Sequence, residues 1–258
     1  FSYTAVLFAV SGIATVLILP KEPSSTEQPN QLFDRSQVLD QLRPPAHAPE
    51  FSRMFAARTC MMAGVGLTGV FLWYLVRFWV YGKAVVLTSA PLTIPAGFLI
   101  AGMAVATLIG AALASWAAGP ISERIEEKNI PVARVVAGAC LLYAAGLALA
   151  WGLGVWSTGT ARENGMLLFA LISGFAFGVY DSLGLELVMD SLPDPRRAGH
   201  DLGIYALANS AGLALAAIIG ALLVNAFEHS FGYYLLFPSA IVMVLLAGIV
   251  TLTTKSAE

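Results

Sequence analysis

Hydrophobic residues along the chain form seven long blocks that are separated by more polar stretches. Each block is long enough to cross a bilayer as a helix, which takes about 20 mainly apolar residues for about 30 Å of hydrocarbon. The blocks lack the regularly spaced polar face that a water-exposed strand or helix carries. The pattern predicts an all-α integral membrane protein with about seven transmembrane helices, at approximately 1–19, 59–81, 95–118, 132–153, 165–188, 202–226 and 231–252.

One long polar segment, from Lys21 to Arg58, lies between the first two blocks. It is rich in proline, serine, glutamine and charged residues and lacks a sustained apolar stripe, which is typical of a linker. We therefore divide the chain into a single helix at 1–19, a linker at 20–58 and a six-helix bundle at 59–258.

Composition supports a membrane environment and excludes one class of partner. Of the 258 residues, 58% are hydrophobic and 12% are charged, whereas a soluble domain carries about twice that charged fraction. The basic residues lie mostly between the apolar blocks, so we expect the lipid bilayer and no nucleic acid as a partner. Cys60 and Cys140 lie inside apolar blocks without a metal-ligand spacing, so we expect no metal and no cofactor.

The distribution of positive charge predicts how the helices are oriented, because short cytoplasmic loops are enriched in lysine and arginine. Alternate loops receive very different numbers of these residues. One side has eleven, namely Lys21, Arg35, Arg43, Arg53, Arg58, Arg124, Lys128, Arg134, Arg196, Arg197 and Lys255, and the other has Arg77, Lys83 and Arg162. We expect the linker and the C-terminus to be cytoplasmic, in a bacterial plasma (inner) membrane.

Glycines recur within the apolar blocks, where small residues allow membrane helices to approach closely. They predict a tightly packed bundle. Those inside the blocks include Gly64, Gly66, Gly102, Gly110, Gly138, Gly174, Gly178, Gly184, Gly212 and Gly220.

Three stretches carry a family resemblance. Residues 192–203 read LPDPRRAGHDLG and are followed by the triplet at 208–210, Ala-Asn-Ser; a second stretch runs from Pro49-Glu50-Phe51 to Arg58. Both resemble the glycoside and sucrose cation-symporter branch of the major facilitator superfamily, at the loop between its tenth and eleventh helices and at the approach to its seventh.

The third stretch, GPISERIEEK at 119–128, resembles the cytoplasmic signature of the same superfamily between the eighth and ninth helices. Here Glu123 replaces the usual aspartate, and Glu126 and Glu127 replace a glycine and an arginine. The resemblance makes six residues of the two cytoplasmic loops candidates for gating contacts. They are Gly119, Glu123, Arg124, Asp190, Arg196 and Arg197.

The resemblance spans nearly the whole chain, laid out as the sixth to twelfth helices of a twelve-helix transporter. It implies that the chain is a C-terminal half whose N-terminal half is missing. It also implies a secondary transporter for a small polar solute, such as a sugar or glycoside, with proton or sodium coupling.

Carboxylates within the 165–188 block are the strongest candidates for chemistry. A charge at membrane depth costs about 2.5–3.5 kcal/mol on insertion scales, so a charged residue there is expected to have a structural or functional role. Asp181 lies inside the apolar run and is a candidate for binding a proton or pairing with a cation; a structural contact to an arginine or to water is the alternative. For Glu186 and Asp190 we favour a helix-end acid that reaches water.

Other polar residues within the blocks are candidates for solute binding. Arg77, flanked by aromatic residues, could hold a sugar or anchor the helix in an interfacial aromatic belt. Tyr180, Tyr205 and Asn209 could hydrogen-bond a polyol, or could instead bond between helices.

Two other classes of function fit the pattern less well. A seven-helix retinal protein would need a lysine deep in the last helix, and residues 231–252 contain none. A membrane enzyme would need a nucleophile and base or a metal set, and the sequence shows neither. A receptor or a non-transporting solute sensor remains the alternative to a transporter.

Overall fold

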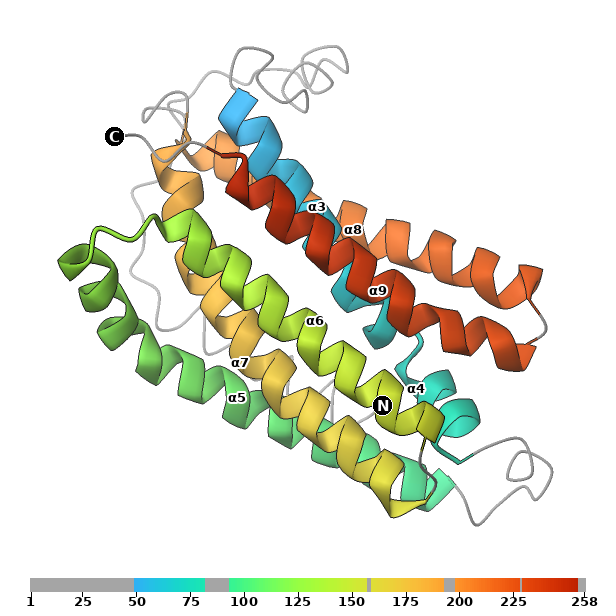
Figure 1. Ribbon diagram of the computed structural model, residues 1–258. Helices are drawn as coiled ribbons and strands as arrows, with labels where there is room; N and C mark the ends of the chain where they lie inside the picture. Colours follow the sequence, from blue (N-terminus) through green and yellow to red (C-terminus); the bar gives the residue numbers. More distant parts are fainter. Residues whose placement is uncertain (1–48, 82–92, 157–158, 193–197, 228, 255–258) are drawn as a thin grey trace, which may run out of the picture. The chain divides into compact units, whose positions relative to one another are not determined.

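The computed structural model describes residues 49–81, 93–156, 159–192, 198–227 and 229–254, and these residues form helices joined by turns (Figure 1). The predicted helix at 1–19 and most of the predicted linker lie outside the described residues. In chain order the elements are α3 (Pro49–Gly69), α4 (Leu72–Tyr74), the π-helical turn η1 (Leu75–Val80), α5 (Thr93–Glu127), α6 (Val132–Trp156), α7 (Thr160–Asp190), α8 (Ala198–Ala226) and α9 (His229–Leu252).

Five of these helices, α5 to α9, are long and apolar enough to cross a membrane. Each corresponds to one of the blocks that the hydrophobic pattern predicted. The fold prediction, an all-α membrane bundle, is therefore confirmed for this part of the chain.

The block at 59–81 differs from the prediction in where it begins and in being interrupted. Helix α3 begins at Pro49, inside the predicted linker, and ends at Gly69, so that a turn separates it from α4 and η1. Proline is well suited to a first helical turn, and Glu50 lies where the helix dipole favours a negative charge. The charges of this segment concealed a helical stripe of buried residues, Phe51, Met54, Ala57 and Met61.

The predicted loop at 119–131 is also largely helical, because α5 continues through Pro120 to Glu127. Ile121 and Ile125 lie four residues apart and pack against the core, while the charged residues between and after them are exposed. Gly119, Glu123 and Arg124 therefore lie on a helix end, not on a loop. The turn to α6 passes through Asn129, whose φ of 48° is a left-handed conformation that asparagine tolerates.

The helices pack in two groups. Helix α7 packs against α5 and α6, and α3 packs against α8 and α9, while α6 also contacts α9. A second, smaller core joins the start of α3 to the start of α6, the end of α7 and the start of α8, through residues such as Phe51, Leu187 and Ile204. The described part of the predicted linker, residues 49–58, thus packs within the bundle.

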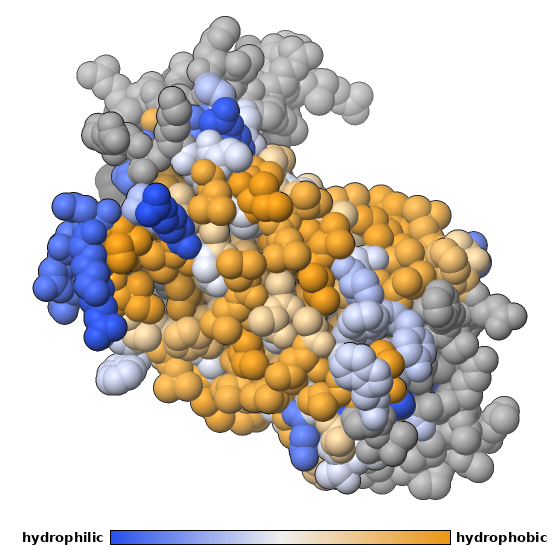
Figure 2. Space-filling view, in the orientation of Figure 1, coloured by the Kyte–Doolittle hydropathy of each residue, from blue (hydrophilic) through white to orange (hydrophobic). Residues whose placement is uncertain are grey.

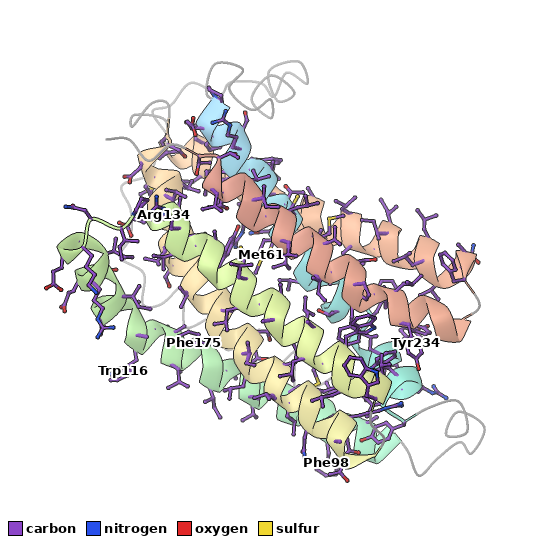
Figure 3. All side chains as sticks on the ribbon, viewed as in Figure 1. Met61, Phe98, Trp116, Arg134, Phe175 and Tyr234 are labelled. Atoms are coloured by element: carbon purple, nitrogen blue, oxygen red, sulfur yellow. The ribbon has the colours of Figure 1, made fainter. Side chains whose placement is uncertain are left out.

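The outer surface is apolar, as lipid contact requires. In α5 and α8 only 22% of the most apolar window is buried, against 50% in α6 and α7. Phe98 and Trp116 are 75% and 80% exposed and point away from the other helices (Figure 3). Figure 2 shows that hydrophilic residues gather at the C-terminal end of α5, whereas hydrophobic residues cover the middle of this face.

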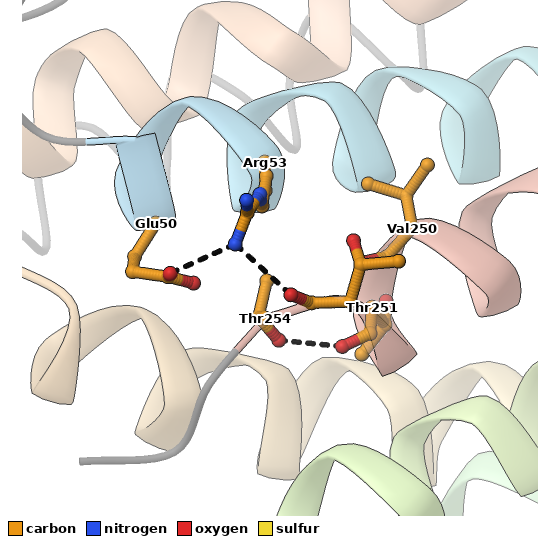
Figure 4. Close-up of polar contacts among 6 residues, drawn as sticks. Glu50, Arg53, Val250, Thr251 and Thr254 are labelled. Atoms are coloured by element: carbon orange, nitrogen blue, oxygen red, sulfur yellow. Dashed lines mark hydrogen bonds and ion pairs between the residues drawn. The ribbon is translucent and has the colours of Figure 1, made fainter.

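The N-terminal turns of α3 hold the C-terminal end of α9 (Figure 4). One guanidinium nitrogen of Arg53, Nη1, donates to Glu50 Oε1 at 2.8 Å and to the carbonyl oxygen of Thr253 at 3.0 Å. The last carbonyls of a helix have no partner within it and carry partial negative charge, so a cation there is favourable.

Replacing Arg53 with alanine should therefore lower the stability of the bundle modestly, by about 0.5–1 kcal/mol, because the side chain is partly exposed to solvent. Thermal unfolding in detergent would measure the change, with Arg53→Lys as the control that keeps the charge. A midpoint unchanged by Arg53→Ala would show that this contact adds nothing to stability.

Candidate functional site

Arg58 of α3 connects three helices. Its Nη1 atom lies 2.7 Å from Oδ1 of Asp181 in α7, forming an ion pair. Its Nε atom donates a hydrogen bond of 2.7 Å to Oδ1 of Asn209 in α8. The guanidinium thus uses its forked geometry to bind two acceptors from different helices at once.

Three aromatic rings surround the same guanidinium. Its central carbon lies 5.6 Å from the ring centres of Phe177 and Tyr180 and 5.9 Å from that of Tyr205. These distances are within the range of cation–π attraction, which strengthens when the cation is withdrawn from water. We call Arg58, Asp181, Asn209 and these three aromatic residues the Arg58 cluster.

Helical periodicity explains how the sequence assembles this cluster. Residues three or four apart lie on one face of a helix. Phe177 and Asp181 are four apart on α7, and Tyr205 and Asn209 are four apart on α8. Each helix therefore presents an aromatic ring and a polar acceptor toward Arg58.

The two members of the ion pair differ in exposure. The side chain of Arg58 is 11% exposed, whereas that of Asp181 is 54% exposed. A guanidinium as enclosed as that of Arg58 requires acceptor oxygens around it, because a buried charge left without any partner is strongly destabilising. Asp181 supplies that partner and still has an accessible side.

A cavity of about 390 Å³ opens beside Asp181. It lies among α3, α5, α6 and α7, and its walls combine aromatic rings, small residues and hydroxyl groups. The polar and aromatic residues that line it are Asp181, Thr107, Ser115, Ser173, Ser182, Tyr143 and Phe177.

The four serine and threonine hydroxyls of this cavity direct their protons away from it. Each donates to a carbonyl oxygen three or four residues earlier in its own helix, at distances of 2.9 to 3.1 Å. A hydroxyl that has donated its proton can still accept hydrogen bonds through its oxygen. With the Asp181 carboxylate, these groups give the cavity a lining of hydrogen-bond acceptors.

The structure brings together four of the five predicted binding candidates. Asp181, Asn209, Tyr180 and Tyr205 all belong to the Arg58 cluster. Arg77 does not, because it lies beyond the end of α3 in η1, which packs against α9 and α5.

The other predicted residues lie apart from this cluster. Glu186 and Asp190 are exposed on the last turns of α7, and Arg196 and Arg197 lie outside the described residues. Within the described ranges no group of three or more His, Cys, Asp or Glu side chains is placed to hold a metal ion.

Arg58 is the important residue that the sequence interpretation misplaced, since it was counted among the linker charges. A signal for it was present in the sequence. Arg58 directly follows Ala57 and precedes Met61, and both of these residues belong to the apolar stripe. Arg58 therefore lies within a helix and not in a solvated loop.

Comparison with known proteins identifies the family but no individual relative. Residues 103–258 match the family model of the Major Facilitator Superfamily. Searches of curated proteins and of solved structures returned no match. Because the family match covers more than half of the chain, and agrees with an apolar all-helical bundle, the chain belongs to the Major Facilitator Superfamily of membrane transporters.

Proposed function

We propose that the chain is part of a secondary active transporter that moves a small polar solute of the sugar or glycoside class. Transport would occur by alternating access and would be coupled to protons or sodium. The observation that supports this proposal best is the acceptor-lined cavity beside Asp181, at membrane depth in an otherwise apolar bundle.

The exposure of Asp181 supports an aqueous cavity at this place. A carboxylate that faced lipid at this depth would cost about 2.5–3.5 kcal/mol. Its accessible side must therefore meet water, solute or protein. The proposed protein partner is an N-terminal half of the same polypeptide, which would close the cavity from the opposite side.

The lining of the cavity suits a solute that is rich in hydroxyl groups. Sugar hydroxyls can donate to the serine and threonine oxygens and to the carboxylate. Phe177 and Tyr143 line the cavity with aromatic rings, which can contact the apolar side of a sugar ring. This combination of a few polar groups with aromatic walls is typical of small-molecule sites.

The charged helix ends support the proposed orientation and gating. The exposed Glu123 and Arg124 at the end of α5, and Asp190 at the end of α7, would meet the cytoplasmic side of the partner half. Arg196 and Arg197 would belong to the same side, together with the C-terminus, in a plasma membrane.

Uptake measurements test the transporter proposal. The gene upstream of Phe1 would be read first, and five further apolar spans are expected. Vesicles containing the full protein would then be given radiolabelled sucrose, maltose or methyl glucoside under an imposed proton or sodium gradient. Accumulation driven by one gradient supports the proposal, whereas saturable binding without accumulation would favour a solute sensor.

A labelling experiment tests the cavity without knowledge of the solute. In a variant with Cys60 and Cys140 replaced by alanine, Ser182→Cys should react with a membrane-impermeant maleimide, because the side chain lines the open cavity. Leu108→Cys on the lipid-facing side of α5, where the leucine is 69% exposed, should not react. If Ser182→Cys, like Leu108→Cys, fails to react with the maleimide, that result would contradict an aqueous cavity.

A further inference from the structure

We infer that Arg58 determines the charge selectivity of the solute site, by neutralising Asp181 so that the cavity favours uncharged, hydrogen-bond-donating solutes over ions. This inference rests on the proposed function, because it concerns the same cavity. It assigns a specificity-determining role to a residue that does not line the cavity itself.

The charges around the cavity balance. Among the described residues that line it, Asp181 is the only one with a formal charge. Alone, this carboxylate would attract cationic solutes and repel anionic ones. Arg58 Nη1 lies 2.7 Å from its Oδ1 atom, so at the distance of a solute the two charges largely cancel.

The position of Arg58 builds this neutralisation into the helix packing that the structure describes. The bond to Asn209 and the three surrounding rings hold the guanidinium beside Asp181. With only 11% of its side chain exposed, Arg58 is shielded from the salt that screens surface charges. It acts on a solute through Asp181, as a positioning residue.

The hydrogen-bonding lining adds a preference for solutes that carry hydrogen-bond donors. The hydroxyls of Thr107, Ser115 and Ser182 have committed their protons to their own helices. A solute must supply the protons, which hydroxyl groups can do and carboxylate or phosphate groups cannot. The site is therefore suited to neutral polyols and unsuited to anions.

A pair of charged thiol reagents measures the potential in the cavity directly. The full protein would carry Ser182→Cys in a background with Cys60 and Cys140 replaced by alanine. The probes are a trimethylammonium-bearing and a sulfonate-bearing methanethiosulfonate, which differ in the sign of their charge. The readout is the ratio of the cationic to the anionic labelling rate, divided by the same ratio for a free thiol.

Removing one member of the ion pair should change this ratio in a predictable direction. Arg58→Gln should raise it by about tenfold, the size expected for one uncompensated charge several ångströms away in water. Asp181→Asn should lower it by a similar factor, and the double variant should return it close to the parent value. Arg58→Lys keeps the charge and should leave the ratio unchanged.

A cysteine far from the cluster controls for general effects. Glu127→Cys lies at the exposed end of α5, and its ratio should not respond to Arg58→Gln. If Arg58→Gln fails to fold, Asp181→Asn and Arg58→Lys still decide the question. Normal labelling at Ser182→Cys with no change of ratio in Arg58→Gln or in Asp181→Asn would overturn the inference and leave the cavity intact. Absence of any labelling would overturn the proposed function itself.

Discussion

Replacing Asp181 with asparagine is expected to reduce gradient-driven uptake by the full transporter to background while the protein stays folded and inserted. Asparagine has nearly the same shape, and its carbonyl oxygen can still accept the hydrogen bond from Arg58. It cannot carry a charge or take up a proton. Accumulation in energised vesicles would measure the loss, and solute exchange without a gradient should persist.

The matched control for this variant is Glu186→Gln. It removes the same charge from the same helix, but Glu186 is exposed near the end of α7 and contributes nothing to the Arg58 cluster. Uptake by this variant should remain within about twofold of the parent protein, an effect below 1 kcal/mol. Undiminished accumulation by Asp181→Asn would remove Asp181 from the coupling mechanism.

Replacing Gly174 with alanine should destabilise the bundle by about 1–3 kcal/mol, the usual cost of overpacking a core. The added Cβ would lie 2.2 Å from the carbonyl oxygen of Thr107 and 2.8 Å from its Cα. Gly110 makes the reciprocal contact, 2.3 Å from the carbonyl oxygen of Leu171. Because these atoms belong to the backbone, the helices must separate. The midpoint of thermal unfolding in detergent would measure the cost.

Gly184→Ala is the matched control on the same helix, because its added Cβ meets nothing within 4 Å. Alanine is the better helix former by up to about 1 kcal/mol, so this variant should be as stable as the parent or slightly more stable. Equal effects of the two substitutions would show that the predicted crowding at Gly174 does not govern stability.

The sequence predicted the five long helices correctly because their signal is local. An apolar block of sufficient length in α5 to α9 can be recognised without knowledge of its neighbours. Helix α3 was partly missed because Glu50, Arg53 and Arg58 lower its hydropathy. Two of these charged residues bind a partner that is distant in sequence. Arg53 binds Thr253, and Arg58 binds Asp181.

The same limit applies to the candidate site. The sequence could single out polar residues in apolar helices, because burying a polar group in a membrane is costly. These residues were Asp181, Tyr180, Tyr205 and Asn209. The sequence could not show that they share one partner, since that depends on how α3, α7 and α8 pack. For the same reason the sequence could not show that Arg77 lies apart from them.

The cavity wall has one part that should behave as a rigid body. At Gly110 and Gly174 the backbones of α5 and α7 touch with no side chain between them, so the two helices have little freedom to slide or part. Arg58 and Asn209 belong to the other helices, α3 and α8. We therefore expect α5 and α7 to move together during any opening of the cavity, so that a displacement of α3 relative to them would have to separate Arg58 from Asp181.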